Sequence, residues 1–108
     1  MAYAERLFHN TETGRYLFVG LRAQDSIALA KQATSSARSQ FEGGGELSSQ
    51  IGDEAYQAYP EESATGVQFE TGVLFRKNRY VGLVALAENN PTRKEVIALG
   101  QNLATELS

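Results

Sequence analysis

The side chains best suited to chemistry in this chain of 108 residues are two pairs of neighbouring acids, Asp53-Glu54 and Glu61-Glu62. Carboxylate oxygens are the ligands that calcium prefers, and a pair of carboxylates can also cleave a glycosidic bond. The alternating ligand spacing of a calcium loop is missing, however, and so small a domain rarely offers the cleft that a sugar needs. The pairs therefore predict a solvated acidic loop and not a metal or sugar site.

The other reactive groups lack the neighbours that catalysis requires. His9 is the sole histidine, and its predicted turn offers no group to orient it as a general base. The chain has no cysteine, which excludes disulfides, a thiol nucleophile and the usual zinc sites. Gly43-Gly44-Gly45 follows a predicted helix and precedes no Lys-Ser or Lys-Thr pair, so it predicts a connector and not a phosphate loop. We therefore expect a protein that is not an enzyme and that holds no metal or cofactor.

A small basic cluster of Arg76, Lys77 and Arg79 marks a predicted hairpin tip. With aromatic residues on the adjoining strands, such a cluster is typical of some RNA-binding sheets. The net charge of −3 and the pI near 5.1 argue against nucleic acid and against an anionic membrane surface. The cluster is therefore predicted to keep the hairpin soluble. No run approaches the ~18 apolar residues of a membrane span, so we expect no membrane insertion.

Two strands joined by this basic turn form the predicted centre of the fold. Side chains in Val67–Arg76 alternate with a period of two, which is the strand period. Tyr80–Leu86 is apolar on both faces, a pattern typical of a central strand with something packed on each side. Arg15–Arg22 shows the same pattern, and Tyr3–His9 is predicted to be an edge strand.

Two amphipathic segments are predicted to be helices. The first begins after Asp25, which is placed to cap it, and runs to about Phe41. The second begins near Asn90, and residues 42–65 between the helical and strand segments are predicted to be a long loop. Apolar side chains recur at helical spacing in both helices: Ile27, Ala30, Ala33 or Thr34, Ala37 and Phe41 in the first, and Val96, Leu99, Leu103 and Leu107 in the second.

An internal repeat organises these elements. Leu7-Phe8, a polar turn and Arg15-Tyr16 recur as Leu74-Phe75, a polar turn and Arg79-Tyr80. Residues 3–41 and 66–107 are therefore predicted to be two strand–strand–helix units, joined by the loop 42–65 within one domain of residues 1–108. The alternative is coincidence in a simple pattern. We expect an α+β fold: a four-stranded, mainly antiparallel sheet with both helices on one face.

That arrangement would leave the other face of the sheet as a large apolar patch. Patches of this kind usually mark an interface or a ligand groove. The first functional hypothesis is therefore an interaction or sensor domain that pairs with a second copy, or with another protein, through six residues of that face. They are Tyr16, Phe18, Leu74, Tyr80, Val84 and Leu86. The alternatives are coverage of the patch by the loop and a groove for a small molecule.

The second functional hypothesis uses the long loop. A loop of this length in a small domain is unusual and often functional. A pocket between the sheet and residues 43–65 would make the chain a small-ligand-binding or enzymatic domain. Its lining would include Asp53, Glu54, Tyr56 and Tyr59.

Three segments carry a resemblance to a known group of proteins. A helix that opens on Asp25-Ser26, then Ile51–Tyr56 (IGDEAY) and then Leu74–Tyr80 (LFRKNRY) resemble the small α+β domains of bacterial cell-envelope lipoproteins and of actinobacterial serine/threonine-kinase sensors. The resemblance covers about residues 15–107 and implies an extracytoplasmic, non-enzymatic domain. It supplies no binding residues. Residues 1–5 lack the pattern of a signal peptide, so this setting would make the chain an excised domain.

Overall fold

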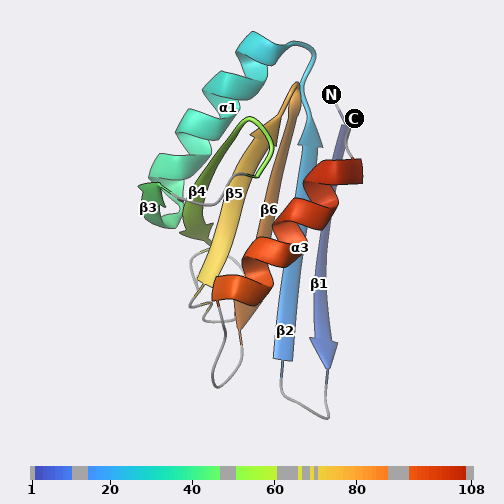
Figure 1. Ribbon diagram of the computed structural model, residues 1–108, viewed down its shortest axis with the longest axis vertical. Helices are drawn as coiled ribbons and strands as arrows, with labels where there is room; N and C mark the ends of the chain where they lie inside the picture. Colours follow the sequence, from blue (N-terminus) through green and yellow to red (C-terminus); the bar gives the residue numbers. More distant parts are fainter. Residues whose placement is uncertain are drawn as a thin grey trace.

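The computed structural model describes residues 2–10, 15–46, 51–60, 66, 69, 71–87 and 93–106. These residues form one sheet with the strand order β1-β2-β6-β5-β4-β3, in which every neighbouring pair is antiparallel (Figure 1). The elements in chain order are β1 (Ala2–Asn10), β2 (Arg15–Ala23), α1 (Ile27–Gln40), β3 (Glu42–Glu46), β4 (Glu54–Tyr59), β5 (Thr71–Lys77), β6 (Tyr80–Ala87) and α3 (Arg93–Glu106).

The α+β class, the antiparallel sheet and the two helices are confirmed. The four predicted strands are β1, β2, β5 and β6, and they lie next to one another in the sheet. The sheet is wider than predicted because β3 and β4 form inside the segment 42–65 that we expected to be a loop. β3 contains the three glycines and pairs with β4 through an irregular register between Gly43 and Gly45. Its edge position explains the misassignment, since an edge strand tolerates glycine and irregular pairing better than a central one.

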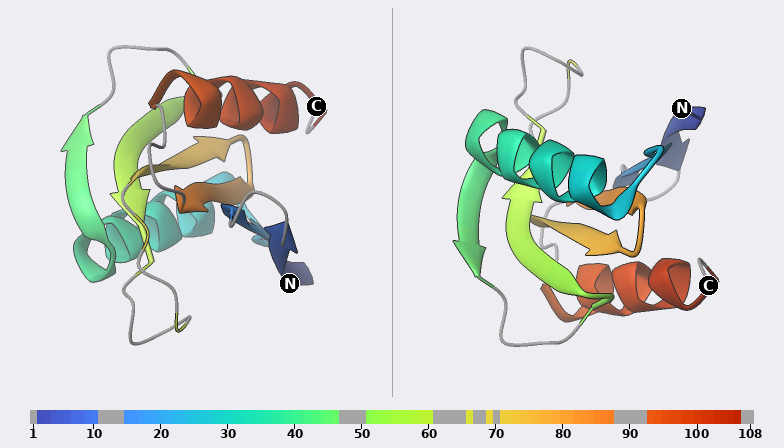
Figure 2. Two further views of the ribbon diagram at one scale, coloured as in Figure 1. Left: turned by 90° about the horizontal axis from the view of Figure 1, so that it is seen from below. Right: turned by 90° about the horizontal axis from the view of Figure 1, so that it is seen from above.

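The placement of the helices differs from the prediction. α1 packs against β3, β5 and β6, whereas α3 packs against β5 and β6 from the other side of the sheet (Figure 2). The expectation that both helices share one face is therefore wrong. The physical reason lies in β5 and β6, which are buried along nearly their whole length. A strand that is apolar on both faces needs cover on both faces.

Each helix closes its own hydrophobic cluster against the sheet. On the α1 side the buried residues are Phe18, Ala30, Ala58, Phe69, Leu74, Val81, Leu83, Ala85 and Ala87. On the α3 side they are Ile51, Val73, Phe75, Val84, Leu86, Val96 and Ala104. The predicted stripe of α3 is confirmed for Val96, Leu99 and Leu103, while Leu107 lies outside the described residues.

The start of α1 also differs from the prediction. The N-cap is Ser26 and not Asp25: the Ser26 hydroxyl oxygen accepts a hydrogen bond of 3.1 Å from the Leu29 amide. The buried residues of the helix are Ala30 and Thr34, and the Thr34 hydroxyl donates to the Ala30 carbonyl at 2.8 Å. Ile27, expected to anchor the helix on the sheet, is half exposed. The large apolar side chains of the first turn, Ile27 and Leu29, are therefore partly exposed, and the smaller residues Ala30 and Thr34 are the buried ones.

The two predicted units share their order of elements but not their packing. The hairpins β1-β2 and β5-β6 meet through the antiparallel pair β2-β6. A rotation about an axis perpendicular to the sheet would superpose the hairpins, and it would leave both helices on the same face. α1 and α3 lie on opposite faces (Figure 2). One rotation therefore cannot superpose the whole units, and the proposed duplication stays a prediction about the sequence.

Candidate functional site

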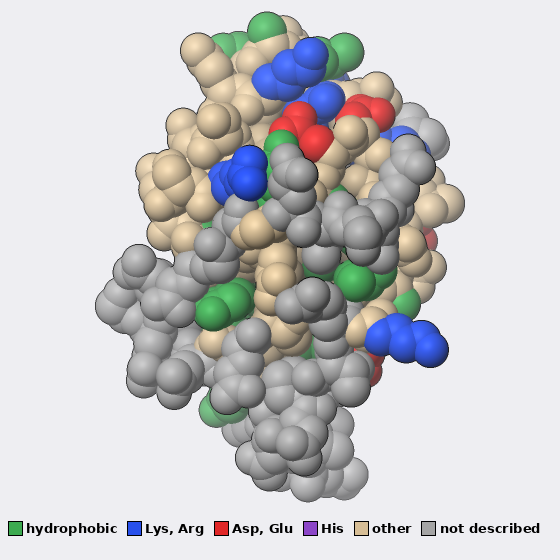
Figure 3. Space-filling model, turned by 60° about the vertical axis from the view of Figure 1, so that its left-hand side comes forward, with side chains coloured by type: hydrophobic (Ala, Val, Ile, Leu, Met, Phe, Trp, Pro, Cys, Tyr) green, Lys and Arg blue, Asp and Glu red, His purple; other side chains and the backbone are tan. Residues whose placement is uncertain are grey.

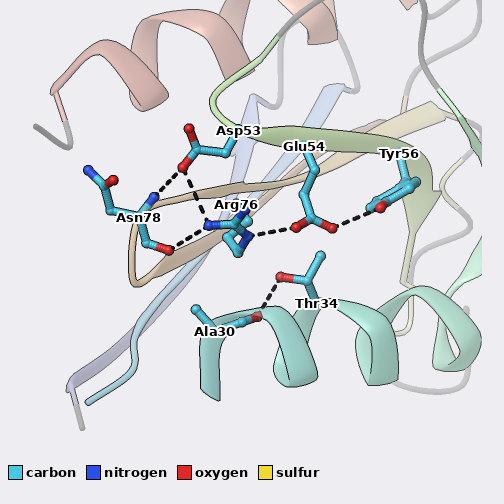
Figure 4. Close-up of polar contacts among 7 residues, drawn as sticks. All are labelled: Ala30, Thr34, Asp53, Glu54, Tyr56, Arg76 and Asn78. Carbon is cyan, nitrogen blue, oxygen red and sulfur yellow. Dashed lines mark hydrogen bonds and ion pairs between the residues drawn. The ribbon is translucent and has the colours of Figure 1, made fainter. Parts of the chain in front are cut away.

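Arg76 lies at the centre of a polar cluster between β4 and β5. Arg76 is only 7% exposed, so its positive charge requires hydrogen-bond acceptors or negative charges nearby. Its Nε donates to Glu54 Oε2 at 2.6 Å, and one terminal nitrogen donates to the Asn78 carbonyl at 2.9 Å (Figure 4). The same nitrogen lies 3.4 Å from Asp53 Oδ2. The prediction that Arg76 belongs to a solvated cationic tip is therefore wrong: it is a buried structural cation.

Asp53 fixes the turn that connects β5 to β6. Its Oδ2 accepts a hydrogen bond of 2.6 Å from the Asn78 amide, and its own amide donates to the Arg76 carbonyl at 2.7 Å. Asn78 has φ +54°, the bend expected of it. Gly52 has φ +61°, and a Cβ at that position would lie 2.5 Å from the Arg76 carbonyl oxygen. Glycine is thus required there for both conformation and space.

Glu54 joins this cluster to Tyr56 and to α1. Burial works to raise the pKa of Glu54, but hydrogen bonds from Arg76 and Tyr56, with the charges of Arg76 and Lys31, hold that pKa below its usual value. The Tyr56 hydroxyl donates to Glu54 Oε1 at 2.8 Å, and the Arg38 guanidinium lies 4.1 Å from the centre of the Tyr56 ring. Acidic and basic side chains lie side by side on this face of the molecule (Figure 3). The charges of Arg76, Glu54 and Asp53 are therefore paired with one another within the cluster.

The four residues predicted to line a ligand loop are therefore occupied by structural contacts. Asp53, Glu54 and Tyr56 belong to the polar cluster, and Tyr59 packs against the hydrophobic cluster under α1. The second acidic pair, at residues 61–62, lies outside the described residues. The segments IGDEAY and LFRKNRY, which carry the family resemblance, contact each other here. The polar residues of these two segments therefore serve the contact between β4 and β5, and they do not line a ligand pocket.

A groove lies between α1 and the sheet and is suited in size to a ligand. Its volume is about 740 Å³. Its floor comes from β2, β5 and β6 and its wall from one stripe of α1. Its ends come from Arg22 near the end of β2 and from residues that follow β2, α1 and β4. The floor residues are Phe18, Gly20, Leu21, Leu74, Val81, Gly82 and Leu83; the wall residues are Leu29, Gln32, Ala33, Ser36, Ala37 and Gln40; the end residues are Arg22, Gln24, Phe41 and Pro60.

The local sequence explains why this space stays open. α1 meets the sheet mainly over β3, β5 and β6, which leaves the space above β2 unfilled. The small side chains of Ala33, Ser36 and Ala37 on the wall leave space unfilled, and Gly20 adds no side chain to the floor. The Phe18 ring is fixed by an edge-to-face contact with Phe69, with ring centres 6.2 Å apart. The groove therefore follows from the position of α1 together with the size of these side chains.

The lining of the groove is apolar below and polar but mostly uncharged above. Phe18, Val81 and Leu83 are all buried, so the floor is deep. The polar lining residues are amides and a hydroxyl, and Arg22 is the charged residue among the lining residues that the structure describes. Carboxylates and imidazoles do not occur in this described lining. Such a surface can hold an apolar molecule and orient it by hydrogen bonds, but it pairs no nucleophile with a base.

The six predicted interface residues do not form one uncovered face. Tyr16, Phe18 and Leu74 belong to the cluster under α1, whereas Val84 and Leu86 belong to the cluster under α3. Phe18, Leu74, Val84 and Leu86 are buried, and Tyr80 is partly buried. The premise of the interface prediction fails because the second helix covers the face that was expected to be open.

Two further expectations concern metals and membranes. Among the residues that the structure describes, no three histidine or acidic side chains gather closely enough to hold a metal ion. Neither described helix combines the length and the apolar character that crossing a membrane requires. His9, expected in a turn, lies near the end of β1 opposite Tyr16.

Comparison with known proteins gives no relative: no protein-family model, no curated protein and no solved structure matches this chain. The groove is therefore judged on its own geometry.

Sequence reasoning missed the groove because its residues come from distant segments. The one available signal is the run of small residues in the first helix, which is equally compatible with close packing against the sheet.

Proposed function

We propose that this chain is a non-enzymatic binding domain whose ligand site is the groove between α1 and the sheet. The observation that carries the proposal is the cavity of about 740 Å³ with an apolar floor and a polar rim that includes Arg22. Small-molecule sites typically enclose ~300–1,000 Å³ and combine apolar walls with a few polar groups. The groove also replaces the pocket expected between the sheet and residues 43–65: its main wall is α1, and Phe41 and Pro60 close one end.

The family resemblance supports a sensing role for such a site. Domains of the kinase-sensor type suggest a chain outside the cytoplasm that reports on a molecule it binds. In that setting the occupied groove is the signal, and the rigid polar cluster around Arg76 holds β4 and β5 in place. We therefore favour a sensor or carrier of small apolar molecules over a domain that pairs through its sheet.

The test uses Nile red, an uncharged apolar dye whose fluorescence rises in apolar sites. We expect saturable binding at one dye per chain. Ser36→Phe should abolish it, because Ser36 lines the groove and is itself exposed, so a ring there fills the cavity without disturbing the core. Ser35→Phe is the matched control, since Ser35 is also exposed on α1 and does not line the groove.

Equal binding by both phenylalanine variants would show that the dye uses another surface and would overturn the proposal. Absence of binding by the parent chain would do the same. Circular dichroism of each variant verifies that α1 stays folded. A second groove variant, Gly20→Val, fills the floor from a strand position, where a Cβ would lie 3.3 Å from the Phe18 ring.

A further inference from the structure

We propose that the groove binds one long-chain fatty acid, with its hydrocarbon tail under α1 and its carboxylate beside Arg22. This inference rests on the proposed function and names the ligand class of the same site. It follows from the length of the groove, the position of its charge and the strands that form its floor.

The groove is elongated along α1. Its α1 wall runs from Leu29 to Gln40, a span of about 16 Å at the helical rise of ~1.5 Å per residue. The wall residues recur every third or fourth position, so they form one continuous stripe along the helix. An extended hydrocarbon tail matches a trough of this length.

The two ends of the groove differ in charge. Arg22 and Gln24 lie at the end where β2 leads into α1, and the Arg22 side chain is exposed. Phe41 and Pro60, which follow α1 and β4, close the other end without charge. No described lining residue carries a negative charge. Arg22 already makes a contact within the chain, but a guanidinium carries five N–H donors. An anionic head can therefore bind at the Arg22 end, where it remains in contact with water, and an apolar tail end fits the Phe41 end.

The floor leaves no edge to which a peptide strand could be added. A bound peptide strand needs an open sheet edge for its backbone hydrogen bonds. The floor strands β2, β5 and β6 are interior strands, each hydrogen-bonded on both sides. A sugar would leave its hydroxyl groups against Phe18, Val81 and Leu83, which offer no hydrogen bonds. A saturated chain needs no partner on such a floor.

The first test is a chain-length series, in which decanoate, dodecanoate and tetradecanoate displace Nile red at concentrations below micelle formation. Each buried methylene contributes ~0.8 kcal/mol, so we expect affinity to rise about fourfold per added carbon until the groove is full. An affinity that does not change with chain length overturns the fatty-acid assignment. If Nile red binds the groove and no fatty acid displaces it, this inference fails while the proposed function stands.

The second test separates the head from the tail. Arg22→Gln should weaken dodecanoate about two- to fivefold, the range for an exposed charge pair, and should leave uncharged dodecanol unaffected. Lys94→Gln on α3 is the matched control, because it removes the same charge from an exposed position away from the groove. Equal effects of Arg22→Gln on acid and alcohol, or equal effects of the two substitutions, would overturn the placement of the carboxylate. Ser36→Phe should abolish binding of both ligands.

Discussion

Arg76 and Glu54 face each other directly across the pair β4-β5, and the arginine Nε lies 2.6 Å from the glutamate Oε2. Directly opposed side chains are the unit of stabilisation between strands. Here the pair is unequal, because the arginine side chain is 8% exposed and the glutamate side chain 26%. The arginine therefore depends on its partners more than they depend on it.

Replacing Arg76 with alanine should destabilise the fold. The change leaves the Glu54 carboxylate and the Asn78 carbonyl without their shared donor, and losses of this kind cost ~1–3 kcal/mol. Arg76→Lys should recover only part of that loss, because an ammonium group cannot reproduce the planar fork. Urea unfolding at neutral pH measures both variants.

The matched control is Lys77→Ala, the neighbouring cation, which is more exposed. We expect it to change the free energy of unfolding by less than ~0.5 kcal/mol, as is usual for surface positions. If Arg76→Ala proved as mild as Lys77→Ala, the polar cluster would contribute no stability to the fold.

The free energy of unfolding should decrease as the pH is lowered into the acidic range, partly because of Glu54. The pKa of Glu54 lies below its ordinary value of 4.5 in the folded chain, so the unfolded state binds its proton at the higher pH. Stability therefore rises with pH in this range, is complete above about the ordinary value and is lost as pH falls through the folded value. Glu54→Gln should consequently differ most from the parent at pH 7.

Urea unfolding between pH 7 and pH 3 checks this sign. The difference in unfolding free energy between the parent and Glu54→Gln should shrink as the pH falls. Glu106→Gln, at an exposed position near the end of α3, serves as the control. A difference that is constant across the range would mean that ionised Glu54 does not stabilise the fold.

The turn at Asn78 offers a test of backbone strain. Its φ of +54° lies in the left-handed region, which asparagine tolerates and β-branched residues do not. Asn78→Gly should therefore leave stability within ~0.5 kcal/mol of the parent, whereas Asn78→Val should cost ~1–3 kcal/mol. Thermal unfolding of the pair distinguishes the two cases. Equal melting temperatures would indicate that the turn relaxes to another conformation.

The sequence predicts the strands better than it predicts what covers them. Alternation in Thr71–Lys77 and the two-faced pattern of Tyr80–Ala87 identify β5 and β6, because side-chain period follows directly from backbone geometry. The same pattern also calls for cover on both faces. It does not state which helix covers which face, because the pattern carries no information on the path of the chain between β6 and α3. The placement of α3 on the second face is therefore a tertiary result.

The candidate site was less predictable than the fold. Its wall depends on Ala33, Ser36 and Ala37, and small side chains on a helix are equally compatible with close packing and with a groove. Only the offset of α1 from β2 decides between them, and no local pattern encodes that offset. The role of the acidic pair Asp53-Glu54 was also not predictable from its neighbours in the sequence. Its partners Arg76 and Asn78 lie more than twenty residues away and are visible only once β4 and β5 pair.

The last prediction concerns the contact between β6 and the α3-side cluster. Gly82 has no side chain, and a Cβ there would overlap the ring of Phe75, which is fully buried. Gly82→Ala should therefore force the ring or the strand to move and cost ~1–3 kcal/mol, the range for overpacking a core. Gly45→Ala is the matched control, because no atom lies within 4 Å of a Cβ at that position. Urea unfolding should show a lowered midpoint for Gly82→Ala alone, and equal midpoints would mean that Phe75 does not pack on Gly82 in solution.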